Sequence, residues 1–267
     1  MAKVLGAAVA LGVAAAYVTP LALWLGLQKD PSEVQSLMAP WSKDSLLGSV
    51  DSWGVLAGGM LLLYNLSYVL TLHAKMPTTQ MRVTGLMRIL VGIALLYAHF
   101  ELKAPNMNLI IAGNDITTGL FTVLIPTSAM SLIPNTLITA VLGAAFFFPE
   151  LRAKIGPIFA KLAAAIPVAK VDPIVPDQLT LFVLGSFLMA IYATLPLVGA
   201  LTMNTRCLRA TGKVAAYTVF LFAVAYARSL ISPEVAVAYG GAHAIAAALL
   251  LTFVPKEAMP TKKQKTI

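Results

Sequence analysis

The sequence predicts an all-α fold, a polytopic transmembrane helix bundle, on three observations: high apolar content, low charge and recurring apolar segments. The chain has 267 residues, of which 59% are hydrophobic and 11% are charged, and its mean hydropathy is +0.84. Soluble domains carry about a quarter charged residues. A domain of this size cannot bury so much apolar surface, so a soluble enzyme and a disordered chain are excluded. A nucleic-acid binder is excluded as well, despite the net charge of +8.

Eight apolar segments approach the roughly 20 residues that a helix needs to cross the hydrocarbon layer. They cover residues 4–27, 53–72, 83–100, 109–133, 134–148, 179–203, 214–231 and 235–254. The first could be a signal peptide, but it exceeds the usual apolar region of about 7–15 residues, which favours a retained helix. The fifth is short. Between the fifth and sixth, residues 158–166 are predicted to form a short helix lying in the membrane interface.

The positions of the basic residues predict the orientation. Short loops before the third and seventh segments carry Lys75, Arg82, Arg206, Arg209 and Lys213. Cytoplasmic loops are enriched in Lys and Arg, and both loops lie on one side only if an even number of spans separates them. The sequence therefore predicts eight spans with cytosolic N- and C-termini.

These basic residues most simply set topology and touch anionic headgroups. A dedicated phosphate or headgroup site at Arg82, Arg88 and Arg209 is the alternative. Arg88 stands near one end of the third segment, from which its side chain can reach the headgroups.

An internal repeat relates the two halves of the chain. Arg82-Val83-Thr84-Gly85 is matched by Arg209-Ala210-Thr211-Gly212, 127 positions later. Gly58 and Gly185 keep the same offset, as do Gly113 and Gly240. Chance is the competing explanation, because Ala, Gly and Leu are abundant. A true duplication predicts two parallel four-helix units, residues 1–128 and 129–255, followed by a basic cytosolic tail over residues 256–267.

Part of the first half resembles a known family. The positions that carry the resemblance are Arg82, Gly85, Arg88, Leu90, Gly92, Tyr97, Ala98 and Ala112 to Asp115. They look like small four-helix membrane proteins of the DoxX-like type and their uncharacterised relatives. The resemblance covers about 45 residues and implies a four-helix unit; it assigns no functional residue.

Ionisable side chains inside apolar segments are costly and mark candidate functional residues. Asp115 lies about six residues into the fourth segment, and His99 and Glu101 end the third. Arg228 and His243 take comparable depths in the second half. If the bundle gathers them, Asp115, His99, Glu101 and His243 form a catalytic acid–base cluster. The residues predicted to bind the substrate beside it are Asn114, Arg228, Tyr97 and Tyr226.

A purely structural reading of these residues stays open. Asp115 could pair with Arg228, or with threonine and backbone groups, and simply join the two halves. His99 alone fits an interfacial residue better than a metal ligand. The single cysteine, Cys207, allows no intrachain disulfide, and the sequence holds no metal-ligand spacing and no cofactor motif. We therefore expect neither a metal nor a cofactor.

The C-terminus carries Lys263 and Lys265, at the fifth and third positions from the end. This spacing resembles the di-lysine retrieval signal of endoplasmic-reticulum membrane proteins and predicts that location. A lysine-rich end that merely anchors the last helix is the alternative.

Three functions fit the sequence. The first is a membrane protein that binds or converts a lipophilic small molecule, such as a sterol, terpenoid or acyl lipid. The second is a non-catalytic accessory subunit that partners another membrane protein. The third is a small-solute transporter, because parallel repeats occur in transporters.

Overall fold

The computed structural model describes residues 1–27, 33, 50–73, 78–101, 107–126, 133–165 and 178–256, and these residues hold helices and no strand. The helices are α1 (Ala2–Leu27), α3 (Val50–His73), α4 (Thr78–Glu101), α5 (Met107–Leu124), α6 (Ile133–Phe147), α7 (Pro149–Ala164), α8 (Gln178–Leu201), α9 (Thr205–Ala227) and α10 (Pro233–Phe253). The predicted all-α class is confirmed for this part of the chain.

Each of the eight predicted apolar segments overlaps one helix, but several bounds differ: α9, for example, begins at Thr205 rather than at residue 214. α5 ends at Leu124 rather than at residue 133. Pro126 follows closely, and a residue before proline disfavours helical backbone. α7 begins at Pro149, well before the predicted residue 158. Proline suits the first turn of a helix, and Glu150 beside it complements the positive end of the helix dipole.

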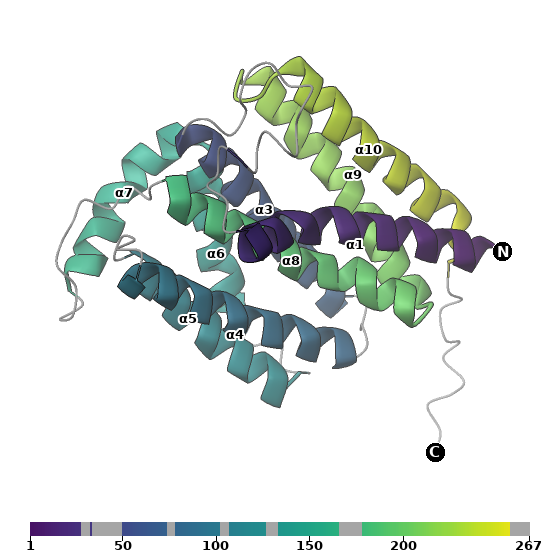
Figure 1. Ribbon diagram of the computed structural model, residues 1–267, viewed down its shortest axis with the longest axis horizontal. Helices are drawn as coiled ribbons and strands as arrows, with labels where there is room; N and C mark the ends of the chain where they lie inside the picture. The colour runs from purple at the N-terminus through teal and green to yellow at the C-terminus, as the bar shows by residue number, and fades with distance from the viewer. Residues whose placement is uncertain are drawn as a thin grey trace.

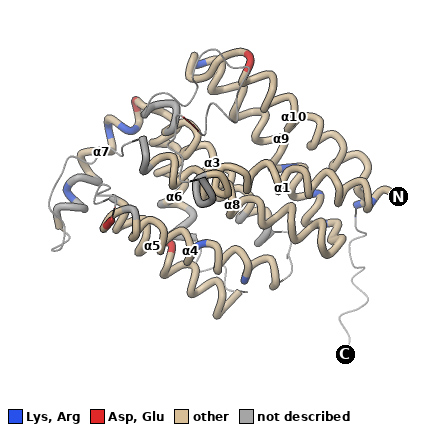
Figure 2. Tube along the Cα trace, viewed as in Figure 1, with Lys and Arg blue, Asp and Glu red and all other residues tan. Residues whose placement is uncertain are grey.

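Among the residues that the structure describes, five helices are long and apolar enough to cross a membrane, which supports a multi-pass membrane protein. They are α1, α4, α8, α9 and α10, and α3 adds a shorter apolar stretch, Gly54–Ser67. Charged residues are sparse along the helices and concentrate on α7 and near helix ends (Figure 2). The described side chains of Leu181–Leu201 in α8 are almost all buried within the bundle.

The helices pair around the central α8 (Figure 1). α4 lies against α5 on one side of it, and α9 lies against α10 on the other. α1 packs mainly on α8, whereas α6 packs mainly on α3. The first helix of the chain is therefore packed against helices of the second half.

Glycines bring two of these pairs into backbone contact. A Cβ added to Gly58 on α3 would lie 2.5 Å from the Gly143 carbonyl oxygen on α6. A Cβ added to Gly119 on α5 would lie 2.7 Å from the Gly85 carbonyl oxygen on α4. Small residues that allow such close crossings are typical of helix packing in membranes.

The start of α1, the start of α9 and the end of α10 meet at one end of the bundle. A Cβ added to Gly6 would lie 2.6 Å from Val254 Cγ2 and 3.5 Å from Leu208 Cδ1. Figure 1 likewise shows α10 ending beside the N-terminus. The first and last described helices thus have one end of the bundle in common. The predicted basic tail, apart from Lys256, lies outside the described residues.

Candidate functional site

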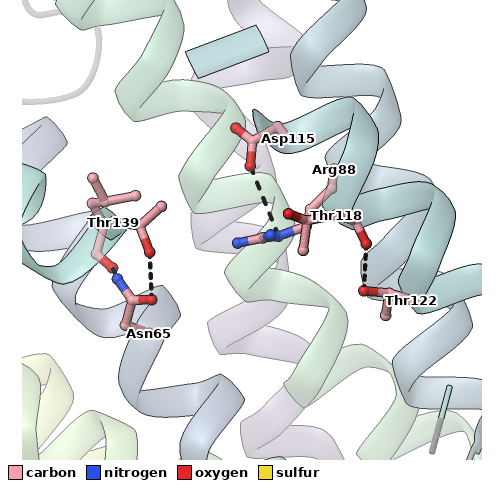
Figure 3. A network of polar contacts seen from close by, with 7 residues as sticks. Asn65, Arg88, Asp115, Thr118, Thr122 and Thr139 are labelled. Carbon is pink, nitrogen blue, oxygen red and sulfur yellow. Dashed lines mark hydrogen bonds and ion pairs between the residues drawn. The ribbon is translucent and has the colours of Figure 1, made fainter. Parts of the chain in front are cut away.

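A buried ion pair joins α4 to α5 near the middle of both helices (Figure 3). Arg88 Nε lies 3.8 Å from Asp115 Oδ1, and the two side chains are 2% and 8% exposed. The Arg88 guanidinium also lies over the Tyr64 ring of α3, 4.5 Å from its centroid. Aromatic faces attract cations, so Tyr64 and Asp115 together compensate a charge that would otherwise be costly at this depth.

Short polar contacts link further helices in the same region. Thr139 on α6 donates to Asn65 Oδ1 on α3 over 2.7 Å. Gln80 on α4 contacts the Thr194 hydroxyl on α8 at 3.3 Å. Within α5, the Thr122 hydroxyl donates to the Thr118 carbonyl (Figure 3). The first two contacts join neighbouring helices, and all three give buried hydroxyl or amide groups a polar partner.

A second polar cluster lies in the other half of the bundle, between α1, α8, α9 and α10. The Tyr17 phenol on α1 hydrogen-bonds His243 Nε2 on α10. His243 Nδ1 lies 2.7 Å from the Tyr239 carbonyl oxygen. A ring nitrogen facing a carbonyl must carry the proton, so Nε2 is the acceptor and Tyr17 is the donor. The result is a neutral tyrosine–histidine pair with a defined direction.

Aromatic and hydroxyl groups surround this pair. The Tyr192 ring of α8 meets the Tyr17 ring edge-on, with centroids 4.4 Å apart. Thr218 on α9 also reaches the Tyr17 phenol. Phe222 on α9 stacks nearly parallel to Tyr239 and faces His243 at 6.1 Å. Tyr17 and Tyr192 are buried, whereas His243, Tyr239 and Phe222 are half-buried at the surface of the bundle.

The predicted single acid–base cluster is not formed, because its members have different partners. Asp115 pairs with Arg88 and His243 with Tyr17. Arg228 is exposed and pairs with Glu150, with its guanidinium over the Phe148 ring, so of the alternatives left open for Asp115 the pairing with Arg228 is not formed. The pattern of apolar residues in the sequence does not fix how each helix is rotated about its axis, so it does not predict which polar side chains face one another.

The remaining predicted site residues lie at or near the surface. His99 is half-buried with its ring against Phe100, and Glu101 is exposed. Tyr97 and Tyr226 are about half exposed. Asn114 is half-buried beside Asp115 in the sequence of α5.

The three arginines predicted to touch headgroups differ from one another. Arg88 is buried within the bundle and pairs with Asp115. Arg209 is half-buried and donates to the Leu251 and Val254 carbonyl oxygens over 2.9 and 2.7 Å. It thereby caps the end of α10, where helix carbonyls lack partners. Arg82 is exposed.

Sequence reasoning missed three aromatic residues, Tyr17, Tyr64 and Tyr192. Each stands inside an apolar helix, and a hydroxyl there needs a polar partner. That signal was present, but helical periodicity does not say which neighbour would supply the partner.

No family model, curated protein or solved structure matches the chain. The resemblance of the first half to DoxX-like proteins therefore stays a prediction. Among the described residues, no three His, Cys, Asp or Glu side chains gather closely enough to hold a metal ion.

Proposed function

We propose that the protein binds or converts a lipophilic small molecule, such as a sterol, terpenoid or acyl lipid, within the bilayer. The observation that carries this proposal is the Tyr17–His243 pair, a proton donor and acceptor held in an apolar bundle with the histidine half-buried. Ligand sites combine mostly apolar walls with a few placed polar groups, and this cluster has that composition.

In this proposal the Tyr17–His243 pair, rather than Asp115, has the acid–base role. Asp115 is only 6% exposed and is paired with Arg88, so a ligand would have to displace a buried charge to reach it. His243 requires no such displacement, because its imidazole is neutral and reaches the bundle surface. A tyrosine and a histidine in contact can pass one proton to or from a bound molecule.

The eight-span topology with cytosolic termini belongs to the same proposal. Two features support it: all eight apolar segments are helical, and the ends of α1 and α10 lie together. We place the protein in the endoplasmic reticulum on the di-lysine spacing at Lys263 and Lys265. Appending two residues after Ile267 is expected to mislocalise a tagged chain; unchanged localisation would contradict this placement.

We also propose that the chain is a duplicated four-helix unit, related in its first half to DoxX-like proteins, whose first helices are exchanged. Under this scheme α1, α3, α4 and α5 correspond to α6, α8, α9 and α10. The pairing of α1 with α8 then mirrors that of α6 with α3, and the pair α4–α5 mirrors α9–α10. Gly85 approaches Val123 as Gly212 approaches Leu250, with both residues 127 positions apart from their counterparts.

Mass spectrometry of co-purified lipids tests the proposed function. The full chain, purified in mild detergent, is expected to retain a specific lipophilic molecule. Tyr17→Phe removes the hydroxyl and keeps the ring, so retention should fall several-fold. Tyr217→Phe, an exposed tyrosine on α9, serves as the matched control. Equal retention in both variants would assign the cluster to structure alone.

The second candidate is a non-catalytic accessory subunit in a membrane complex. The observation that favours it is the presence of two buried polar links between helices, the Arg88–Asp115 ion pair and the Thr139–Asn65 hydrogen bond. A chain that retains no lipophilic molecule, and that loses assembly with one defined membrane partner when Asp115 is replaced, would support this alternative.

A further inference from the structure

The hydrogen-bond directions at the Tyr17–His243 cluster show which of its donors and acceptors are already used and which could still bind a ligand. The Tyr17 proton goes to His243 Nε2, and the Nδ1 proton goes to the Tyr239 carbonyl. Both histidine nitrogens are therefore engaged while the ring is neutral. The Tyr17 phenolic oxygen still has acceptor capacity, because a phenol has two lone pairs.

Tyr192 supplies a donor beside that oxygen. Its side chain is 1% exposed, and its hydroxyl has no hydrogen-bond partner within the described part of the chain. A buried hydroxyl without a partner is destabilising, so the Tyr192 hydroxyl is a donor that a further polar group could engage. The edge-on contact between the Tyr192 and Tyr17 rings, 4.4 Å between centroids, places this donor in the same cluster as the acceptor.

The cluster offers no charge to an ionic headgroup. Its members are Tyr17, Tyr192, Thr218, Phe222, Tyr239 and His243, which are uncharged in the state that the hydrogen bonds specify. A carboxylate or phosphate brought among them would lose its hydration without gaining a counter-charge. A neutral hydroxyl could instead accept one hydrogen bond and donate another.

The half-buried rings indicate where the rest of such a molecule would lie. Phe222 and Tyr239 stack at 7° between their planes, and His243 lies at 30° to Phe222. All three reach the surface of the bundle between α9 and α10. A hydrocarbon skeleton can pack along this aromatic rim while its polar end reaches inward, as in apolar ligand sites with one oriented polar contact.

We propose that the ligand is a neutral lipophilic alcohol, a sterol or a terpenoid alcohol, whose hydroxyl accepts a hydrogen bond from Tyr192 and donates one to Tyr17. This assignment rests on the proposed function and narrows it, because it excludes free fatty acids and phospholipids from the site. Tyr192 is a binding residue in this scheme, and Tyr17 both binds the hydroxyl and connects it to His243.

Binding to the full chain in phosphatidylcholine nanodiscs tests the assignment. The probes are cholesterol and farnesol, each with its methyl ether, and oleate. An ether oxygen accepts a hydrogen bond but cannot donate one. We expect one of the two alcohols to bind about 10-fold more tightly than its ether, and oleate to bind weakly; the alcohol that binds identifies sterol or terpenoid. A tenfold change corresponds to about 1.4 kcal/mol.

Tyr192→Phe is the informative variant because it should fold at least as well as the parent. It deletes a hydroxyl that has no partner in the described structure and is expected to weaken the alcohol about 10-fold, with Tyr217→Phe unchanged. Equal binding of alcohol and ether, or an unaltered Tyr192→Phe, would overturn the alcohol assignment. Oleate binding that is lost in Tyr17→Phe would overturn it too, yet leave the proposed function standing. Binding of no probe and no co-purified molecule would overturn both.

Discussion

The α4–α5 and α9–α10 hairpins share a close glycine contact but bury different side chains between their helices. A Cβ on Gly85 would lie 2.9 Å from Val123 Cγ2, and a Cβ on Gly212 would lie 2.9 Å from Leu250 Cβ. The first hairpin then buries Arg88 and Asp115 in its middle. At the positions 127 residues later the second hairpin has Ala215 and Ala242.

This difference teaches that the hairpin architecture does not need the ion pair. Ala215 is fully buried with Ala246 and Ala247 beside it, and that interface closes on small apolar side chains. A buried ion pair is frequently no more stabilising than well-packed apolar residues, because both charges lose their hydration. Arg88, however, reaches beyond its own hairpin to Tyr64 on α3. The charges therefore tie the first hairpin to the centre of the bundle, a link that the alanines do not make.

The largest expected effect comes from removing one charge of the pair. Asp115→Leu leaves Arg88 buried without its counter-charge and should lower the free energy of unfolding by about 3–5 kcal/mol. The double variant Arg88→Leu, Asp115→Leu makes this hairpin apolar like the second one and should recover most of that loss. Unfolding of each variant in mixed micelles gives the comparison.

A double variant that is as unstable as Asp115→Leu would break the comparison. It would mean that the two hairpins need different interiors, and that Arg88 contributes through Tyr64 rather than through Asp115.

A smaller effect is expected from the two glycines that set the hairpin spacing. Gly85→Ala brings Cβ within 2.9 Å of the Gly119 carbonyl oxygen, which is backbone and cannot swing away. We expect a loss of about 1–3 kcal/mol, as for other overpacked sites. The three atoms nearest to a Cβ on Gly212 belong to the Leu250 and Leu251 side chains rather than to the backbone, so Gly212→Ala should cost less.

Gly113→Ala is the control for these variants, since an added Cβ there meets nothing within 4 Å. It should be neutral or slightly stabilising, because alanine favours helix over glycine. Thermal unfolding of the three variants in the same detergent orders them; equal losses at all three positions would contradict the spacing argument.

The smallest expected effect on stability is the difference between variants of Arg82 and Arg209, which occupy matching positions in the repeat. Arg209→Gln removes two charge-assisted hydrogen bonds to the end of α10 and should cost about 1–2 kcal/mol. Arg82→Gln alters an exposed side chain and should change stability by less than about 0.5 kcal/mol. Hydrogen exchange at the last turn of α10 should increase only in Arg209→Gln; an equal increase in Arg82→Gln would argue against the cap.

Much of the fold followed from sequence, but the candidate site did not. The apolar segments located α1, α3, α4, α5, α6, α8, α9 and α10, and the ionisable residues singled out from the sequence include Asp115 and His243. Their partners were not foreseen. Arg88, expected near the headgroups, is buried and paired with Asp115, while Tyr17, the hydrogen-bond partner of His243, stands 226 positions away in the chain.

The sequence by itself determined an all-α chain of apolar helices, because backbone groups in hydrocarbon must be satisfied within each segment and length and hydropathy report that requirement directly. Only the tertiary structure decided which polar side chains meet. Such meetings depend on the rotation of each helix about its axis and on the choice of its neighbour. The packing of α1 against α8 and α10 brings Tyr17 to His243. The close glycine contact between α4 and α5 brings Arg88 to Asp115.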